Sequence, residues 1–215
     1  MSNPTTEGTI SPAPLESLIL ARYSERTFTG EPIPTGIIEG IVGAAIHAPS
    51  PSGRNPFFFT IVPDMGVIRD LTDELAKGFQ DLRASLPEDE PRKTIDYYER
   101  YTLFIRDASA LVLCYTNDRK SGLAPFVDDS ESEAANLLSL GAVLQNIGLL
   151  CTASSIGHCI LSAPVELFPK VFERCFPAPA HLSLRCIVAM GPPSSQGREK
   201  PRPVQLKRHI KVVDR

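Results

Sequence analysis

Two arginines flank a serine near the N-terminus of this chain, at Arg22, Ser24 and Arg26. In an extended segment every second side chain points to the same side, so these three would face one ligand together. Two planar guanidinium groups and a hydroxyl are donors that match the oxygens of a phosphate monoester. The cluster therefore predicts a phosphate site, with a basic patch exposed to solvent as the alternative interpretation.

A second candidate site is the segment of residues 48–56, which stands between two apolar stretches. Pro49, Ser50, Pro51 and Asn55 combine small side chains with hydroxyl and amide groups. Such a loop can approach a flat ligand closely and form hydrogen bonds with its polar edge. An ordinary turn between a helix and a strand is the alternative interpretation.

Two further groups of side chains could contact a ligand. Lys200 and Arg202 stand in a proline-rich, charged C-terminal segment, a composition that is also typical of a terminus without fixed structure. Tyr97, Tyr101 and Phe104 share one face of an expected helix, because they follow the spacing i, i+4, i+7. This aromatic face could stack against a substrate, or it could pack into the core.

The sequence lacks the common motifs for nucleotide, metal and nucleophilic chemistry. It has no GxxxxGK[ST], no GxGxxG after an apolar run, no HExxH and no GxSxG. His158 and Cys159 are neighbours, but neighbouring side chains on a strand point to opposite faces, so they should not form a catalytic Cys–His pair. We therefore expect neither a side-chain nucleophile nor a metal site.

Length and composition favour one domain. The chain has 215 residues, of which 42% are hydrophobic and 22% are charged, values that are ordinary for a folded protein. Residues 1–13 are expected to form a flexible tail, and residues 14–215 a single domain. The net charge of −3 argues against a nucleic-acid partner.

The cysteines and the apolar runs bear on the compartment. The chain has five cysteines, an odd number, and most of them stand in apolar runs, which predicts buried thiols in a reducing compartment. The N-terminus has no signal-peptide pattern. The longest apolar stretch, Leu137–Cys151, contains polar residues and is expected to be too short to span a bilayer. These features predict a cytoplasmic protein with no membrane partner.

Hydrophobic periodicity predicts an α+β fold in which helices and strands do not alternate strictly. The run Phe57–Val62 is apolar almost throughout and is expected to be a buried strand. The helix expected to end near Cys151 is apolar nearly all round, which predicts burial in a core or in a subunit interface. The other strands are expected at Ala110–Tyr115, Ile156–Leu161 and Leu182–Met190, and the other helices from Leu15, after Pro34, at residues 66–84 and 92–106, and after Pro164.

Several segments, taken in order along the chain, resemble the nitroreductase family of flavoproteins. The resemblance begins with the pattern R-x-S-x-R-x-F, extends from about Leu15 to Leu206 and therefore covers most of the chain. The segments read RYSERTF (22–28), EPIP (31–34), APSPSGRNPFFF (48–59), ASSIGHCIL (153–161), and AMGPP (189–193) followed by KPR (200–202).

The resemblance implies an α+β homodimer that binds FMN, with a central, mostly antiparallel sheet flanked by helices and a C-terminal arm that wraps the partner subunit. Two FMN sites would lie at the dimer interface. Arg22, Ser24 and Arg26 would hold the phosphate and ribityl end of FMN, and Tyr23 would contribute its backbone. The other contacts would come from Lys200 and Arg202 over the phosphate, from Pro49, Ser50 and Pro51 of the other subunit along the ring, from Asn55 at the ribityl chain or ring edge, and from the backbone amides of Gly157 and His158.

The same resemblance implies an oxidoreductase. A hydride would pass from NADH or NADPH to FMN and then to a nitroaromatic, quinone or enone, with ping-pong kinetics. One alternative is a relative with a dedicated biosynthetic role, such as a dehydrogenase or an enzyme that consumes its own flavin. The other alternative is a flavin-binding dimer without turnover.

Some positions depart from the family pattern. Gly53, Asn55 and Phe57 stand where Asn, Gln and Trp are frequent, and the shorter Asn55 could lose its contact or make it through water. Ser155 and His158 stand where Gly and Ser or Thr are usual. His158 is therefore a candidate modulator that acts on the substrate or tunes the flavin. The alternative is that only its backbone N–H takes part.

Overall fold

The computed structural model describes residues 13–87, 90–117 and 129–194, together with Lys211 and Val213. Short 3₁₀ turns lie at Pro51–Gly53 and Phe104–Asp107. The predicted tail lies outside the described residues except for Ala13, which begins the first helix, and most of the predicted C-terminal arm lies outside them too. The helices are α1 (Ala13–Ala21), α2 (Thr35–Ala45), α3 (Met65–Ser85), α4 (Glu90–Leu103), α5 (Asp129–Ala153), α6 (Ala163–Leu167) and α7 (Pro169–Cys175), and the strands are β1 (Phe57–Val62), β2 (Ala110–Asn117), β3 (Gly157–Leu161) and β4 (Leu182–Gly191).

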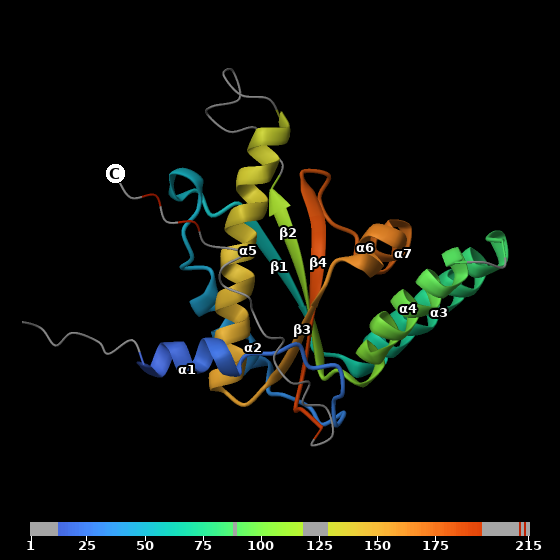
Figure 1. The fold of residues 1–215 in the computed structure, drawn as a ribbon, viewed down its shortest axis with the longest axis horizontal. Coiled ribbons are helices and arrows are strands. Elements are labelled where there is room, and N and C mark those ends of the chain that lie inside the picture. Colours follow the sequence, from blue (N-terminus) through green and yellow to red (C-terminus); the bar gives the residue numbers. More distant parts are fainter. Residues whose placement is uncertain (1–12, 88–89, 118–128, 195–210, 212, 214–215) are drawn as a thin grey trace, which may run out of the picture.

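The strands form an antiparallel sheet in the order β1-β2-β4-β3, with β2 and β4 in the centre (Figure 1). At one end of the sheet Phe57 of β1 pairs with Thr116 of β2. At the opposite end Gly157 of β3 pairs with Gly191 of β4. The prediction of an α+β fold with an antiparallel sheet flanked by helices is confirmed.

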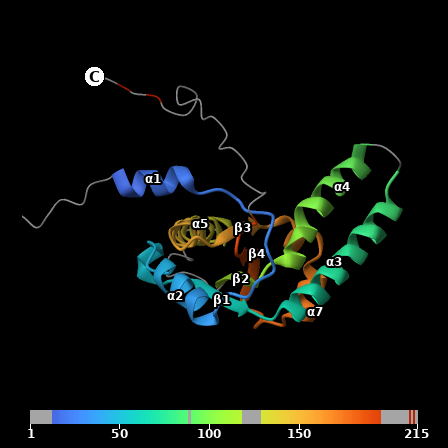
Figure 2. The same cartoon turned by 90° about the horizontal axis from the view of Figure 1, so that it is seen from below.

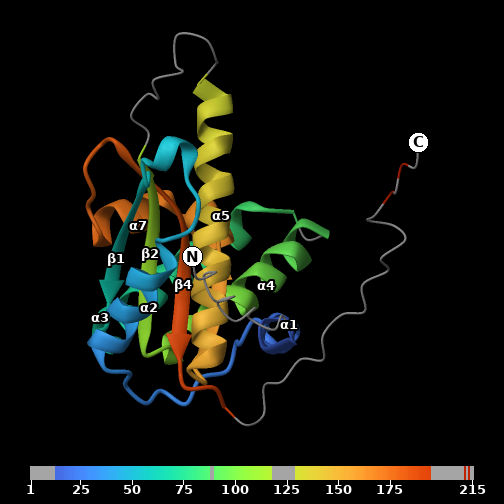
Figure 3. The same ribbon diagram turned by 90° about the vertical axis from the view of Figure 1, so that its left-hand side faces the viewer.

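Helices cover both faces of the sheet (Figures 1 and 3). α2 and α5 pack on one face, where Ile38 and Val143 are fully buried. α3, α6 and α7 cover the other face, where Leu71 and Phe172 are buried. α1 lies across α5, on the side of α5 that faces away from the sheet (Figure 2). Burial of apolar surface in these two layers supplies the main driving force for folding.

The two outermost strands are less buried than the central ones. Every residue of β2 is buried except the last, as the periodicity predicted. For β1 the prediction of a buried strand was wrong, because β1 is an edge strand and is mostly half-buried. Phe58, for example, is 49% exposed. A continuous apolar run is compatible with either position, so the sequence pattern alone does not separate a central strand from an edge strand.

The long helix α5 is buried on one side only. Leu140, Val143 and Ile147 face the sheet and α2, whereas Leu138 is 78% exposed. The stretch Leu137–Cys151, expected to be too short to span a bilayer, lies within a longer stretch, Glu133–Ala153, whose 21 residues are long and apolar enough to cross a membrane by length and composition alone. In this fold the stretch packs against the sheet and α2 and contributes one side to the core.

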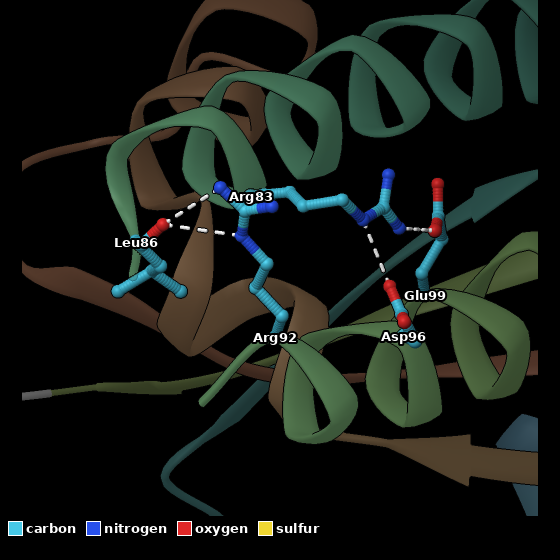
Figure 4. Close-up of polar contacts among 5 residues, drawn as sticks. All are labelled: Arg83, Leu86, Arg92, Asp96 and Glu99. Carbon is cyan, nitrogen blue, oxygen red and sulfur yellow. Dashed lines mark hydrogen bonds and ion pairs between the residues drawn. The ribbon is translucent and has the colours of Figure 1, made fainter. Parts of the chain in front are cut away.

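α3 and α4 lie side by side and extend away from the sheet (Figure 1). Arg83 near the end of α3 donates a hydrogen bond to Asp96 at 2.8 Å and also pairs with Glu99, both on α4 (Figure 4). Arg92 on α4 donates in return to the backbone carbonyl of Leu86, from Nε at 3.1 Å and from a terminal nitrogen at 3.0 Å. These contacts fix α4 against α3 and so fix where its aromatic side chains lie.

Candidate functional site

The predicted phosphate-binding segment lies along the free edge of β3. The backbone N–H of Glu25 donates to the backbone carbonyl of His158 at 2.8 Å. Further along, Thr29 donates to Pro192 at 3.0 Å, and Phe28 forms an isolated bridge with Pro193. The segment is therefore attached to the end of the sheet at which β3 begins and β4 ends.

Arg22 differs from the rest of this segment. Its backbone N–H still donates to the carbonyl of Leu18 at 3.1 Å, so Arg22 belongs to the last turn of α1. The two-residue alternation predicted for Arg22, Ser24 and Arg26 therefore starts only after Arg22. A cation at this position also suits the negative end of the dipole of α1.

Glu25 is the most deeply buried residue of the segment, with 1% of its surface exposed. Its Oε1 accepts hydrogen bonds from the backbone N–H groups of Arg26 and Thr27, both at 2.9 Å, and from the Thr27 hydroxyl at 2.7 Å. Its Oε2 accepts from the hydroxyl of Tyr23 at 2.9 Å. Glu25 was not among the residues predicted from the sequence, although its position between Ser24 and Arg26 already placed it on the opposite side of an extended chain.

Arg26 contacts the aromatic helix α4. Its guanidinium carbon lies 5.0 Å from the ring centroid of Tyr101, within the range of a cation–π interaction. One of its terminal nitrogens is also 3.5 Å from the backbone carbonyl of Ser24. The structure thus brings the predicted aromatic residue Tyr101 next to the predicted phosphate-binding segment within one subunit.

The three predicted aromatic residues of this region do not share one environment. Phe104 packs against the core and has its ring centroid 6.1 Å from that of Phe28. Tyr97 is 50% exposed, so the interpretation of a common core face was wrong for this residue. The buried residues of α4 are instead Ile95 and Thr102. The rings of Tyr97 and Tyr101 are tilted by 45° to each other, with a centroid distance of 4.4 Å, and form an accessible aromatic surface near Arg26.

The side chain of His158 is buried, with 2% exposed, on the face of β3 that packs against α5. Burial, and then the positive charge of Arg22, lower the pKa of His158 to about 4. Its Nε2 is buried without a hydrogen-bond partner among the described residues. Cys159 packs in the apolar cluster on the other face of the sheet, so the two side chains point to opposite faces, as the alternation along a strand predicted.

Gly157 allows a close approach of Glu25. A Cβ at this glycine would lie 2.7 Å from Cγ of Glu25 and 3.1 Å from the backbone oxygen of Gly191. The absence of a side chain is therefore required by packing inside this subunit. The predicted contact between the Gly157 amide and a flavin ring stays a prediction.

The loop after α2 has an unusual backbone that its own side chains stabilise. Ser52, Gly53 and Asn55 have φ values of 52°, 65° and 46°, in the left-handed region that Gly and Asn tolerate best. The hydroxyl of Ser50 donates to Oδ1 of Asn55 at 3.0 Å and accepts from the Asn55 N–H at 3.0 Å. In this structure the predicted ring-edge residue Asn55 is thus paired with Ser50, while Pro49 is exposed and Pro51 is half-buried.

The two predicted clusters lie at opposite ends of the sheet (Figure 1). The loop ends where the carbonyl of Pro56 accepts from Asn117, the last residue of β2. The phosphate-binding segment lies beside His158, whose partner Met190 pairs with Ala110, the first residue of β2. At ~3.4 Å per residue the length of β2 separates the clusters by about 20 Å or more. Lys200 and Arg202 lie outside the described residues.

Comparison with known proteins identifies both a family and a fold. The family model described as "Nitroreductase family" matches residues 19–192. No curated protein sequence matches the chain. Among solved structures, a BluB-like flavoprotein from Clostridium difficile 630 is 20% identical with a TM-score of 0.76, and the match covers 93% of this chain and 99% of that one.

Two further solved structures were determined with a bound cofactor. A nitroreductase with bound FMN from Bacteroides fragilis is 17% identical with a TM-score of 0.70. The FMN-dependent nitroreductase NfnB from Mycobacterium smegmatis, in complex with NADPH, is 15% identical with a TM-score of 0.70. Each of these two matches covers 93% of this chain and 98% of the other.

Proposed function

Because this chain belongs to the nitroreductase family, we propose that it transfers a hydride from NADH or NADPH, by way of bound FMN, to a nitroaromatic, quinone or enone. The observation that carries the proposal is the arrangement of the segment 22–28. Glu25 points into the protein and uses its carboxylate to fix the segment. Arg22, Ser24 and Arg26, all half-buried, are thereby left accessible at the end of the sheet.

These residues fit the phosphate end of FMN. A phosphate monoester is bound best by guanidinium and hydroxyl donors that acidic groups do not already neutralise. Arg22 forms no ion pair with the acidic residues that the structure describes, and the nearby carboxylate of Glu25 is occupied by donors of its own segment. Lys200 and Arg202 are proposed as additional phosphate contacts.

A second subunit would complete the site. The loop 49–56 and the segment 22–28 are too far apart to contact one small ligand within a single chain. A two-fold partner that brings its loop to this subunit's segment would resolve the distance, and the reciprocal contact would form a second site. Exposed leucines on α1 and α5, Leu20 at 67% and Leu138 at 78%, offer apolar surface for such an interface.

FMN, when bound, supplies the redox chemistry, so the protein is required to bind, orient and shield rather than to provide a nucleophile. Arg22, Ser24 and Arg26 would bind the phosphate and ribityl end. Tyr97 and Tyr101 would form an aromatic wall against which a flat donor or acceptor can stack. Pro49, Ser50, Pro51 and Asn55 of the other subunit would line the ring, with the Ser50–Asn55 pair keeping their loop in one conformation.

The first test is the visible absorption spectrum of the purified protein, with the released chromophore identified by mass. Bound FMN is the expected result, and a colourless protein that stays colourless after incubation with FMN would contradict the proposal. Anaerobic reduction by NADH and by NADPH, followed by reoxidation with a nitroaromatic or a quinone, then tests turnover. If the nucleotides reduced the flavin rapidly but neither a nitroaromatic nor a quinone reoxidised it, a dedicated biosynthetic role would be favoured. Slow reduction of the flavin by both nucleotides would favour a flavin-binding dimer without turnover.

A further inference from the structure

We infer that His158 is a positioning residue that orients Arg22 toward the phosphate of FMN, and that Gly148 of α5 provides the space in which the two side chains meet. The inference rests on the proposed function, because it concerns the same cofactor site. It assigns the His158 side chain a role other than acting on the substrate or on the flavin ring.

Gly148 brings three elements together at one point. A Cβ on this glycine would lie 2.8 Å from Nε2 of His158 and 3.1 Å from Cδ of Arg22. Side chains from β3 and from the end of α1 therefore share a notch in α5 that any larger residue would fill. No comparable contact exists at Gly141 of the same helix, where a Cβ would meet nothing within 4 Å.

The imidazole of His158 is suited to accept a hydrogen bond from Arg22. A buried ring nitrogen without a partner is unfavourable, so the unpaired Nε2 is best explained by a donor that reaches it in the working state. Burial, and then the positive charge of Arg22, keep the ring neutral at physiological pH. A neutral imidazole offers one nitrogen lone pair and adds no positive charge next to the guanidinium.

Its burial excludes a direct role in chemistry. With 2% of its surface exposed, the side chain lies beneath the segment and cannot touch a substrate. A hydrogen bond from one guanidinium nitrogen to Nε2 would leave the remaining N–H groups of Arg22 directed outward. A guanidinium held in this orientation would present its remaining donors to the phosphate together, which raises affinity for the phosphate.

The test compares two ligands that differ only in the phosphate, FMN and riboflavin. Dissociation constants would be measured by quenching of flavin fluorescence for the wild type, His158→Ala, His158→Gln and Arg22→Ala. We expect His158→Ala to weaken FMN binding about ten-fold and riboflavin binding less than two-fold. His158→Gln, which keeps an acceptor, should recover most of the loss. A double variant that carries both His158→Ala and Arg22→Ala should bind FMN no more weakly than Arg22→Ala alone, because both changes act through one interaction.

A matched pair of glycine variants tests the notch. Gly148→Ala should reduce the affinity for FMN but not for riboflavin, whereas Gly141→Ala should leave both unchanged. Thermal unfolding of each flavin-free variant identifies any variant that has lost its fold. If Gly148→Ala does not fold, the FMN and riboflavin affinities of His158→Gln and the wild type are compared in its place.

The outcomes separate the inference from the proposed function. Equal losses for FMN and riboflavin would mean that His158 is merely structural and would overturn the inference. An unchanged FMN affinity in His158→Ala, with a loss in Arg22→Ala, would also overturn it while leaving the proposed function intact. A wild-type protein that binds neither flavin would overturn the proposed function itself and the inference with it.

Discussion

The backbone N–H of Glu25 donates a hydrogen bond to the backbone carbonyl of His158 at 2.8 Å, and this contact joins the N-terminal segment to the edge strand β3. It also determines which way the segment faces. With its N–H directed to β3 and its carboxylate buried, Glu25 leaves the side chains of Ser24 and Arg26 near the surface. One buried acid thus organises the residues proposed to bind phosphate.

Removal of the Glu25 carboxylate should loosen this segment. We expect Glu25→Ala to lower the free energy of unfolding by about 3 kcal/mol, because several donors lose a charged acceptor in a buried place. Tyr23→Phe removes one of those donors and should cost only about 1 kcal/mol. Urea unfolding measures both values. If Glu25→Ala and Tyr23→Phe both lowered the free energy of unfolding by only about 1 kcal/mol, the Glu25 carboxylate would not be what holds the segment in place.

Substitution of Arg22 should weaken FMN retention. A charge-assisted hydrogen bond to phosphate contributes ~1.5–3 kcal/mol, so Arg22→Ala should raise the dissociation constant of FMN by about 10-fold to 100-fold. Arg69→Ala is the control, since Arg69 is an exposed arginine on α3 that is not among the residues proposed to bind FMN. Equal affinities in wild type and Arg22→Ala, measured by fluorescence, would refute the phosphate assignment.

The buried His158 should make the protein sensitive to acid. Its pKa is about 4 in the folded protein and ~6.5 when unfolded, so the unfolded state binds more protons between these values. The free energy of unfolding therefore falls as pH drops from ~6.5 to ~4, by about 3 kcal/mol from this residue.

His158→Gln should lack this contribution, whereas His47→Gln, at an exposed position, should behave like the wild type. Urea midpoints measured at several pH values between 7 and 4 test the difference. Parallel pH curves for His158→Gln and the wild type would contradict the assignment of a buried neutral imidazole.

The cysteines should differ sharply in reactivity. Four of the five are buried, as the sequence predicted, and Cys175 is exposed. A hydrogen bond with Cys186, together with burial, raises the pKa of Cys114 well above its usual range, and burial raises that of Cys151 to about 12. Because the thiolate is the reactive form, a thiol reagent at pH 8 should modify one equivalent rapidly in the native protein.

In Cys175→Ser the rapid phase of modification should disappear. Unfolding this variant should then expose the four buried cysteines to the reagent. Ellman's reagent with and without urea gives these counts directly. A rapid phase that persists in Cys175→Ser would mean that one of the buried thiols is accessible in solution.

Much of the architecture could be read from local patterns. The strands appear at the apolar runs, and α3 forms where the amphipathic pattern predicted a helix, because these signals depend only on which side chains avoid water. α5 also forms where a helix was predicted, but it is buried on one side only, with Leu138 78% exposed. The order of the candidate clusters along the chain likewise indicated the family that the comparison established. These properties depend on residue type and spacing, which the sequence states completely.

The roles of single residues in the site depend on contacts between distant segments, which become visible only in the folded protein. Glu25 became the organising residue because β3 offers it a backbone partner, and His158 became buried because Gly148 leaves room for its ring. The position of β1 at an edge follows from strand order rather than from its own apolar run. Residue types and spacing therefore specify the helices, the strands and the donor groups, and much of the core. Strand order, the buried positions of Glu25 and His158, and the distance between the two clusters arise only when the sheet assembles, because each is a relation between distant segments that no local pattern encodes.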